Sequence, residues 1–380
     1  MTGEAPGPET AGPQSLARPS AVELVRVRLP LVRPFRTSFG IQTDREAILV
    51  RAIGADGLEG WGECVADRDP SHDDEWNQVA WLVLRDVLAP AALAGHLPVI
   101  RGSRMARAAI AVSLLDLHLR GSGQSLAGYL GGVRDRVECG VSLGIEDDTE
   151  TLVDLAVRFA EAGYRRVKLK IEPGRDVEVV RAVREALPAI PLSVDANAAY
   201  TLADSDRLAA LDEFGLEYLE QPLAQDRLLG HADLQRRITT PVCLDESITS
   251  AAVAADAIRL AACRVINIKP GRVGGLAEAV RIHGTARGAG VPVWCGGMLE
   301  TGIGRAANLA LASLPGFTLP GDTSGSDRYF HRDVTEPFVV APDGTMAVPR
   351  GPGIGVEPFP DILEETARER VTIRPDVHES

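Results

Sequence analysis

The first third of the chain changes from a strand-like pattern to a helical one. Alternating or β-rich segments come first, at 23–32, 46–53 and 58–63, with an Asp-Gly turn signal before the third. Apolar residues then recur at helical spacing over 76–88 and 105–119. Strands followed by helices predict a small α+β domain, which we place at residues 21–136.

From about residue 137 the pattern becomes regular, with short apolar runs alternating with helical segments. The runs that predict strands are 140–143, 166–170, 192–195, 218–220, 242–245, 265–269, 291–294 and 317–319. The helices expected between them are 151–162, 177–187, 201–214, 251–260 and 276–289. Eight strands in this alternation predict a parallel α/β barrel over residues 137–329. A doubly wound open sheet is the competing architecture.

The two ends of the chain differ in composition from the rest. Residues 1–20 are rich in Pro, Gly, Ala and Ser and lack the basic start and apolar stretch of a secretion signal. We therefore predict a disordered tail there. Residues 330–380 are rich in Pro and Gly, and we expect this segment to pack back on the first domain.

Charge and cysteine content exclude several classes of function. The chain of 380 residues has a net charge of −13, which disfavours nucleic-acid partners and anionic membranes. No apolar stretch approaches the length of a membrane span. Its 5 cysteines are odd in number, scattered and without CxxC spacing, so zinc clusters and disulfides are disfavoured and a reducing cytoplasm fits.

Charged residues stand at the ends of five consecutive predicted strands. They are Lys170, Asp195, Glu220, Asp245 and Lys269, at intervals of 25, 25, 25 and 24 residues. In a parallel barrel these ends converge on one mouth, where active sites lie. Any one of these residues could simply be a polar group emerging into water. The ordered series, with carboxylates between lysines, instead favours a catalytic site.

These residue types suggest roles. Three carboxylates on adjacent strands suit Mg²⁺, and without a cation they would repel one another. Lys170 and Lys269 would flank a metal-bound substrate, but a lysine that acts as a base needs a lowered pKa. Lys168 lies on the same strand face as Lys170 and would lower its pKa by like charge. Arg272 could act similarly on Lys269, or it could be an ordinary loop arginine.

The same motifs closely resemble the enolase superfamily, in its muconate-lactonizing subgroup, and within it the N-acylamino acid racemase / o-succinylbenzoate synthase family. The resemblance covers about residues 22–363. It is strongest in PFRTSFG (34–40), GWGEC (60–64), KLKIEPG (168–174), VDANAAY (194–200), NIKPGRVGG (267–275), VWCGGMLETGIGRA (293–306) and TLPGDTSGSDRY (318–329). It implies a modified (β/α)7β TIM-type barrel with an α+β capping domain.

The resemblance also implies the site. Its metal ligands, for Mg²⁺ or else Mn²⁺ or Co²⁺, would be Asp195, Glu220 and Asp245, and its acid/base pair Lys170 and Lys269. The supporting and substrate residues would be Lys168, Asn197, Glu246, Ser142, Gly297, Met298 and Arg272. The family's shared step is removal of the proton α to a carboxylate, which gives an enolate.

Two reactions follow from that step in the resembling family. One is racemization of N-acyl amino acids, notably N-succinyl ones. The other is a dehydration that forms o-succinylbenzoate for menaquinone synthesis. Arg272 occupies the position that tends to accompany racemase activity. Both substrates are small carboxylates, and we expect a homo-oligomer.

The chain departs from the family pattern in two places. The loop 67–76 (DRDPSHDDEW), expected over the acyl tail, is more acidic than in relatives, which leaves the preferred acyl group open. Asp322-Thr323-Ser324 lacks the second aspartate of dipeptide epimerases. This counts against dipeptide epimerase activity, which stands with muconate cycloisomerase as an alternative within the superfamily.

Alternatives from other classes rest on weaker motifs. Gly302–Ala307 fits a loose GxGxxA dinucleotide pattern, with Asp322 about 20 residues on, which suggests an NAD-dependent oxidoreductase. Gly140–Gly144 imitates the nucleophile elbow of a serine hydrolase, but it lies inside a predicted strand. The third alternative is an inactive binding protein, which the retained strand-end charges disfavour.

Overall fold

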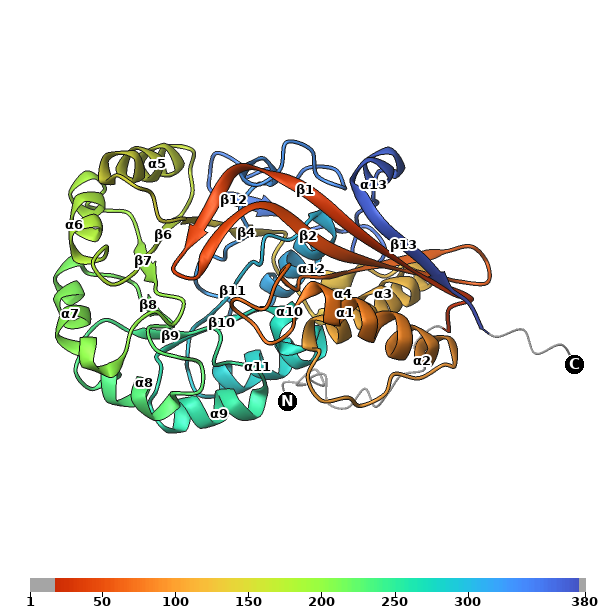
Figure 1. The fold of residues 1–380 in the computed structure, drawn as a ribbon, viewed down its shortest axis with the longest axis horizontal. Coiled ribbons are helices and arrows are strands. Elements are labelled where there is room, and N and C mark those ends of the chain that lie inside the picture. The colour runs from red at the N-terminus through yellow and green to blue at the C-terminus, as the bar shows by residue number, and fades with distance from the viewer. Residues whose placement is uncertain (1–17, 376–380) are drawn as a thin grey trace, which may run out of the picture.

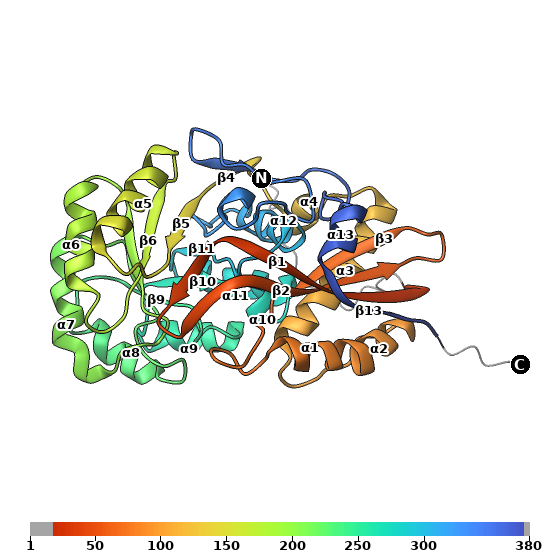
Figure 2. The same cartoon turned by 45° about the horizontal axis from the view of Figure 1, so that its top comes forward.

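The structure is a computed structural model that describes residues 18–375 (Figure 1). Nearly all of the predicted disordered tail, residues 1–17, lies outside the described residues. The chain builds a parallel sheet on one side and an antiparallel sheet with its helices on the other (Figures 1 and 2).

The antiparallel sheet has the strand order β13-β1-β2-β3. Its strands are β1 (Ala21–Thr37), β2 (Gly40–Ile53), β3 (Glu59–Cys64) and β13 (Ala367–Ile373). The helices beside it are α1 (Asn77–Val83), η1 (Leu84–Leu88, a π-helix), α2 (Ala89–Leu93), α3 (Arg104–Ser122) and α4 (Leu126–Leu130). Strands and helices are thus found where the alternation and the helical spacing predicted them.

Glycines in β3 allow helix α3 to lie directly on the sheet. A Cβ on Gly62 would meet the Ala109 carbonyl oxygen at 2.1 Å, and one on Gly60 would meet that of Ser113 at 2.2 Å. Any side chain at these positions would push the helix away. The glycines of the GWGEC motif therefore have a packing role.

The second sheet is parallel, with the order β11-β10-β9-β8-β7-β6-β5. Its strands are β5 (Gly140–Leu143), β6 (Arg166–Lys170), β7 (Leu192–Asp195), β8 (Leu219–Glu220), β9 (Val242–Leu244), β10 (Val265–Ile268) and β11 (Val293–Cys295). This order follows the chain without a reversal, whereas a doubly wound sheet reverses at a switch point. The open-sheet alternative is therefore wrong.

Helices cover the outer face of this sheet (Figure 1). They are α5 (Thr149–Glu161), α6 (Val177–Ala186), α7 (Ser205–Ala209), α8 (Leu228–Gln235), α9 (Ala251–Arg259), α10 (Pro270–Val273), α11 (Leu276–Gly288) and α12 (Gly302–Ala312). The single helix predicted at 201–214 is wrong. Short 3-10 turns, η2 (Leu202–Asp204) and η3 (Ala210–Phe214), flank α7 instead.

The predicted eighth strand, 317–319, is also not a regular strand in the described chain. Phe317 makes a single parallel bridge to Val293 of β11, and Gly321 makes one to Cys139 beside β5. This segment therefore connects the two edges of the parallel sheet with too few ladder hydrogen bonds to count as a strand.

The β1–β2 hairpin reaches across to the carboxyl ends of the parallel strands (Figure 2). Ser38, between the two strands, donates to the carbonyl of Ala196 at 3.2 Å, just past β7. Arg36 pairs with Glu172, past β6, at 3.2 Å. The hairpin therefore lies over the edge of the sheet where the predicted active site would be.

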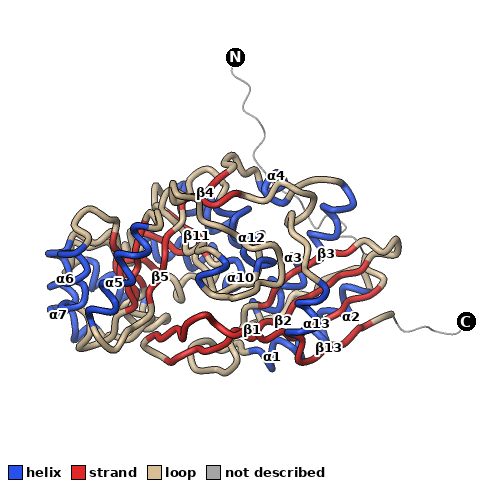
Figure 3. Tube along the Cα trace, turned by 90° about the horizontal axis from the view of Figure 1, so that it is seen from above, coloured by secondary structure: helices blue, strands red, loops and turns tan. Residues whose placement is uncertain are grey.

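The remaining elements lie in the connection between the sheets, at the end of the 137–329 segment and in the C-terminal segment, and Figure 3 labels two of them, β4 and α13. They are β4 (Arg136–Glu138), β12 (Thr345–Ala347), η4 (Ser326–Arg328) and α13 (Pro360–Thr366). Strand β12 pairs with β4, and β13 pairs with β1 over 22–27. We keep the division into 21–136, 137–329 and 330–380 as a proposal.

Candidate active site

Five charged residues lie side by side at the carboxyl edge of the parallel sheet. Lys170 is opposite Asp195 in the β6–β7 pairing, and Asp195 is opposite Glu220 in the β7–β8 pairing. Asp245 and Lys269 each follow the last residue of the next two strands, β9 and β10. The three carboxylates are nearly fully buried.

The backbone turns sharply just beyond two of these carboxylates. Asn197 and Gln221 have φ values of 43° and 37°, in the left-handed region that favours glycine. Each bonds the next loop, since Asn197 donates to Glu246 at 3.1 Å and Gln221 accepts from the Asp245 amide at 3.0 Å. Such strain at a strand end is typical of functional sites.

The first two carboxylates are paired with lysines in the structure. Lys170 lies 2.7 Å from Asp195, and Lys168 lies 2.6 Å from Glu220 and 3.3 Å from Asp195. Lys168 also contacts Asp322 at 2.7 Å. Ammonium groups from β6 therefore neutralise these two carboxylates in the structure.

Burial and charge act against each other on these groups. Burial raises the pKa of Glu220 to about 8, and the charge of Asp195 adds to this effect. Burial also acts to raise the pKa of Asp195, but the charges of Lys170 and Lys168 outweigh it and lower that pKa. Burial acts to lower the pKa of Lys168, but Asp322, Glu220 and Asp195 together raise it well above its ordinary value.

The third carboxylate has its own cations. Lys269 lies 2.6 Å from Asp245, and Arg272 bonds the other Asp245 oxygen. Burial and the charge of Arg272 act to lower the pKa of Lys269, as the sequence suggested for Arg272. The charges of Asp245, Glu246 and Glu220 outweigh them, and the pKa of Lys269 is raised. In this arrangement Lys269 is an acid, and it could accept a proton only after Asp245 moves away.

These residues can be tested for their fit to a divalent cation. Among residues 18–375, no three His, Cys, Asp or Glu side chains are grouped so that they could hold a metal. The donors nevertheless suit Mg²⁺, because they are hard, buried carboxylate oxygens on neighbouring strands. One oxygen of the adjacent Glu246 is buried without a hydrogen-bond partner, as expected beside a cation. The three carboxylates therefore fit Mg²⁺ by their chemistry, although in this structure each of them contacts a lysine.

A loop from the first domain closes against this edge. His72 lies 2.9 Å from Glu246, and its ring stacks on Phe39 of the hairpin with centroids 3.9 Å apart. Burial acts to raise the pKa of Glu246, but the His72 hydrogen bond and the charge of Arg272 lower it well below its ordinary value. Asp73 is buried 3.7 Å from Arg272. The acidic residues of this loop are thus partly neutralised.

One cavity connects the hairpin, this loop and the strand ends. Its lining includes most of the predicted site: Ser142, Lys168, Lys170, Asn197, Lys269, Arg272, Gly297 and Met298. The first domain contributes Phe35, Thr37, Phe39, Gln42, Asp67 and His72, and Leu299, Asp322 and Tyr329 complete it. The predicted ligands Asp195, Glu220 and Asp245, and also Glu246, do not line it and lie beneath the lysines. The Ser142 hydroxyl is buried without a partner.

The chain contains only three lysines, Lys168, Lys170 and Lys269, and all of them lie in this cavity. Every other basic side chain, histidines apart, is arginine. Ammonium groups, whose pKa responds strongly to burial, are thus confined to the candidate site.

Sequence reasoning missed the residues that hold Lys168. Asp322 accepts from Arg166 at 2.6 Å and pairs with Lys168 at 2.7 Å. Arg166 is fully buried and stacks over Trp294, with 5.1 Å from its guanidinium carbon to the ring centroid. Arg166 precedes Lys168 by two residues, so the strand alternation places both on one face. This alternation along the strand could have indicated that Arg166 lies beside Lys168.

The dinucleotide pattern has a structural explanation. Thr301 and Gly304, at the start of α12, donate their amides to Glu63 at 3.0 and 2.9 Å. Gly302 donates to Asp333 at 2.9 Å. A pyrophosphate would need these same amides. The first turn of α12 is therefore capped by carboxylates, which argues against the NAD alternative.

Comparison with known proteins identifies the family. The Enolase C-terminal domain-like family model matches residues 151–362. The model for the N-terminal domain of mandelate racemase / muconate lactonizing enzyme matches residues 20–131. The chain belongs to the enolase superfamily. The expected enolase-like fold is thereby confirmed, with an α+β capping domain and a parallel TIM-like half-barrel of seven strands.

Individual relatives place the chain within the superfamily. It is 55% identical to an N-succinylamino acid racemase from Amycolatopsis sp, over 93% of this chain and 99% of the relative. It is 48% identical to an o-succinylbenzoate synthase from Geobacillus stearothermophilus, over 88% and 92%. A solved enolase superfamily member from Listeria innocua has a TM-score of 0.88 and 35% identity, over 93% and 98%.

Membership of the superfamily bears on the chain's activity and on its metal. The chain is an enzyme of this superfamily close to its N-succinylamino acid racemase and o-succinylbenzoate synthase members. Members typically bind Mg²⁺. Among the described residues, none of the helices combines the length and apolar character that a bilayer crossing requires.

Proposed function

We propose that the protein racemizes N-succinylamino acids by moving the α-proton between Lys170 and Lys269. The observation that supports this most is that both ammonium groups line one cavity, on β6 and just after β10. The carboxylate-bearing ends of β7, β8 and β9 lie between them. One lysine removes the proton from one face of the substrate, and the other returns a proton to the opposite face.

Asp195, Glu220 and Asp245 would hold Mg²⁺, or Mn²⁺ or Co²⁺, with Glu246 beside them. When bound, the cation supplies positive charge next to the substrate carboxylate, where negative charge develops as the proton leaves. Asp322 and Glu220 hold Lys168 in its charged form. Lys168 thereby places a fixed positive charge two residues before Lys170 on the same strand.

The remaining residues of the cavity would orient the substrate. The free Ser142 hydroxyl and Asn197 offer polar contacts, and Gly297 and Met298 offer backbone and apolar surface. Phe35 and Phe39 close the cavity from the hairpin and exclude water. Small carboxylates are the substrates, and a homo-oligomer in the cytoplasm stays our expectation.

A second reaction is o-succinylbenzoate synthesis, in which the same α-proton is removed and a β-hydroxyl leaves. The 48% identity to the Geobacillus stearothermophilus synthase favours it as a companion activity. Arg272 favours racemization as the main one, because it holds Asp245 and thereby positions Lys269. Parallel assays with both substrates will rank the two activities.

The test uses N-succinyl amino acids of each hand in D₂O with Mg²⁺. We expect α-deuterium exchange and racemization, both abolished by EDTA and restored by Mg²⁺. In Lys170→Ala and in Lys269→Ala racemization is lost, while exchange of the enantiomer that faces the remaining lysine persists. Unimpaired turnover in either lysine variant refutes the two-base mechanism.

A control variant separates chemistry from folding. Arg259→Ala removes an exposed cation that pairs only with Asp256, at 2.6 Å on α9. It lies outside the cavity lining, so we expect full activity. Thermal unfolding of all three variants should then show that the lysine variants are folded when they fail to racemize.

A further inference from the structure

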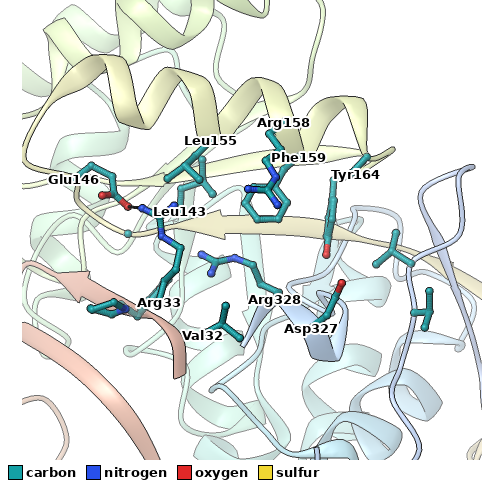
Figure 4. Close-up of a pocket in the computed structure, with 16 residues that line it drawn as sticks. Val32, Arg33, Leu143, Glu146, Leu155, Arg158, Phe159, Tyr164, Asp327 and Arg328 are labelled. Atoms are coloured by element: carbon teal, nitrogen blue, oxygen red, sulfur yellow. Dashed lines mark ion pairs between the residues drawn. The ribbon is translucent and has the colours of Figure 1, made fainter. Parts of the chain in front are cut away.

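A second cavity lies outside the wall of the candidate active site (Figure 4). Its volume is about 290 Å³, and it is formed by β1, the strand end of β5, helix α5, η4 and the segment after η4. The apolar lining includes Leu143, Leu155 and Phe159, and the exposed Val32 and Val339 stand at its rim. The cavity is large enough for a small organic molecule.

Three arginines line this cavity, and two of them lack a carboxylate partner. Arg33 pairs with Glu146 at 3.7 Å, as the dashed line in Figure 4 shows. Among residues 18–375, neither Arg158 nor Arg328 has a carboxylate within ion-pairing distance. Two cations beside an apolar surface form an environment that favours an anionic group.

Arg328 is held in place by its neighbours, but some of its N–H donors have no hydrogen-bond partner. Its guanidinium carbon lies 5.2 Å from the Phe159 ring centroid, 5.3 Å from that of Tyr329 and 5.9 Å from that of Phe35. It donates one bond, to the Ser142 carbonyl at 3.2 Å, and its buried Nε has no partner. Aromatic faces thus fix the guanidinium without neutralising it.

Two acidic residues also line the cavity: Glu146, which pairs with Arg33, and Asp327. In Figure 4 Asp327 lies near Tyr164, whereas the Arg328 guanidinium points away from it, toward Leu143. Asp327 is therefore separated from the Arg328 guanidinium along the cavity, and Glu146 is already paired with Arg33. An anion would bind at the Arg328 end, with its apolar body against α5.

The cavity adjoins the active site without being part of it. Phe35 is the one residue that lines both cavities among the described residues. Ser142 presents its side chain to the active site and its carbonyl to Arg328. A ligand in the second cavity would therefore be separated from the lysines by one layer of residues.

We propose that this second cavity is a binding site for a small monocarboxylate with an apolar body, whose carboxylate binds Arg328 and Arg158. This inference does not depend on the proposed racemase reaction, because it concerns another cavity. It can be tested by binding alone.

The probe is 3-phenylpropionate, with the neutral 3-phenylpropionamide as its matched control, and binding is measured by calorimetry on the full chain. We expect saturable binding of the acid and at least about tenfold weaker binding of the amide, since the amide cannot form charge-assisted bonds. Equal binding of acid and amide, or no binding of the acid, overturns the proposal.

Variants locate the bound molecule. Arg158→Glu changes an exposed residue of α5, and we expect it to weaken binding about tenfold or more by reversing the local charge. Ala162→Trp, also at an exposed position, should block the cavity without touching its charges. Lys269→Ala should leave binding unchanged. Loss of binding in Lys269→Ala, with binding kept in Arg158→Glu, would place the probe in the active site and refute the inference.

Discussion

Replacing Asp322 with asparagine should destabilise the protein strongly, because Asp322 connects two buried cations. It lies 2.6 Å from Arg166 and 2.7 Å from Lys168. An asparagine oxygen could accept a hydrogen bond from one of these two cations. Its amide NH₂ would then face the other cation, and both of those groups are hydrogen-bond donors. Removing one member of a buried ion pair costs about 3–5 kcal/mol.

For Asp322→Asn we expect a cost at the low end of this range, because both cations keep other partners. Lys168 keeps Glu220 at 2.6 Å and Asp195 at 3.3 Å, and Arg166 keeps the Pro320 carbonyl at 3.1 Å. We therefore expect Asp322→Asn to lower the free energy of unfolding by about 3 kcal/mol. In a chain of this size that corresponds to roughly 4 °C in Tm.

The assay is thermal unfolding beside a matched variant, Asp361→Asn. Asp361 pairs with Arg332 at 3.1 Å, but both side chains are mostly exposed. Exposed pairs contribute about 0–1 kcal/mol, so Tm should fall by roughly 1 °C or less. Equal losses in the two variants, or a gain in Asp322→Asn, would show that the buried network does not stabilise the fold as argued.

Two further predictions concern packing and pH. In urea unfolding, Gly62→Ala should destabilise the protein by about 1–3 kcal/mol, because its Cβ would meet the Ala109 carbonyl oxygen at 2.1 Å. The control Gly284→Ala, where α11 leaves open space for a Cβ, should stabilise the protein by up to about 1 kcal/mol. Burial lowers the pKa of His231 to about 4, so the unfolded chain binds a proton at higher pH than the folded one. The free energy of unfolding should therefore fall as pH drops from about 6.5 to 4, by up to about 3 kcal/mol, and a His231→Gln variant should lose that part of the pH dependence. A pH profile identical in wild type and variant would contradict this assignment.

Much of the site was predictable because strand ends leave a local signal. Each of Lys170, Asp195, Glu220, Asp245 and Lys269 ends or follows a short apolar run, and a parallel sheet brings such ends to one edge. The single helix expected over 201–214 failed for a local reason. Thr201 and Asp204 form a capping box there, and the following turns are too short and polar to continue as one helix.

The contacts that tune the site were not predictable, because they join segments far apart in the chain. No periodicity indicates that His72 meets Glu246, or that Asp322 meets Lys168. The pKa of Lys269 is raised, whereas the sequence suggested that Arg272 would lower it. The sequence shows that Arg272 is near Lys269. It does not show that Asp245 contacts Lys269 and that the carboxylate charges outweigh the effect of Arg272 on the pKa of Lys269.

The pairing of β13 with β1 has a consequence for biosynthesis. Residues 22–27 of the first strand take their partners from residues 367–373, which are translated after the whole parallel sheet. One edge of β1 therefore stays without its neighbour until the ribosome has completed the whole barrel. Until then that edge can recruit a strand from another nascent molecule. Synthesis of residues 367–373, rather than emergence of the N-terminal third, is therefore the step that allows this sheet to close.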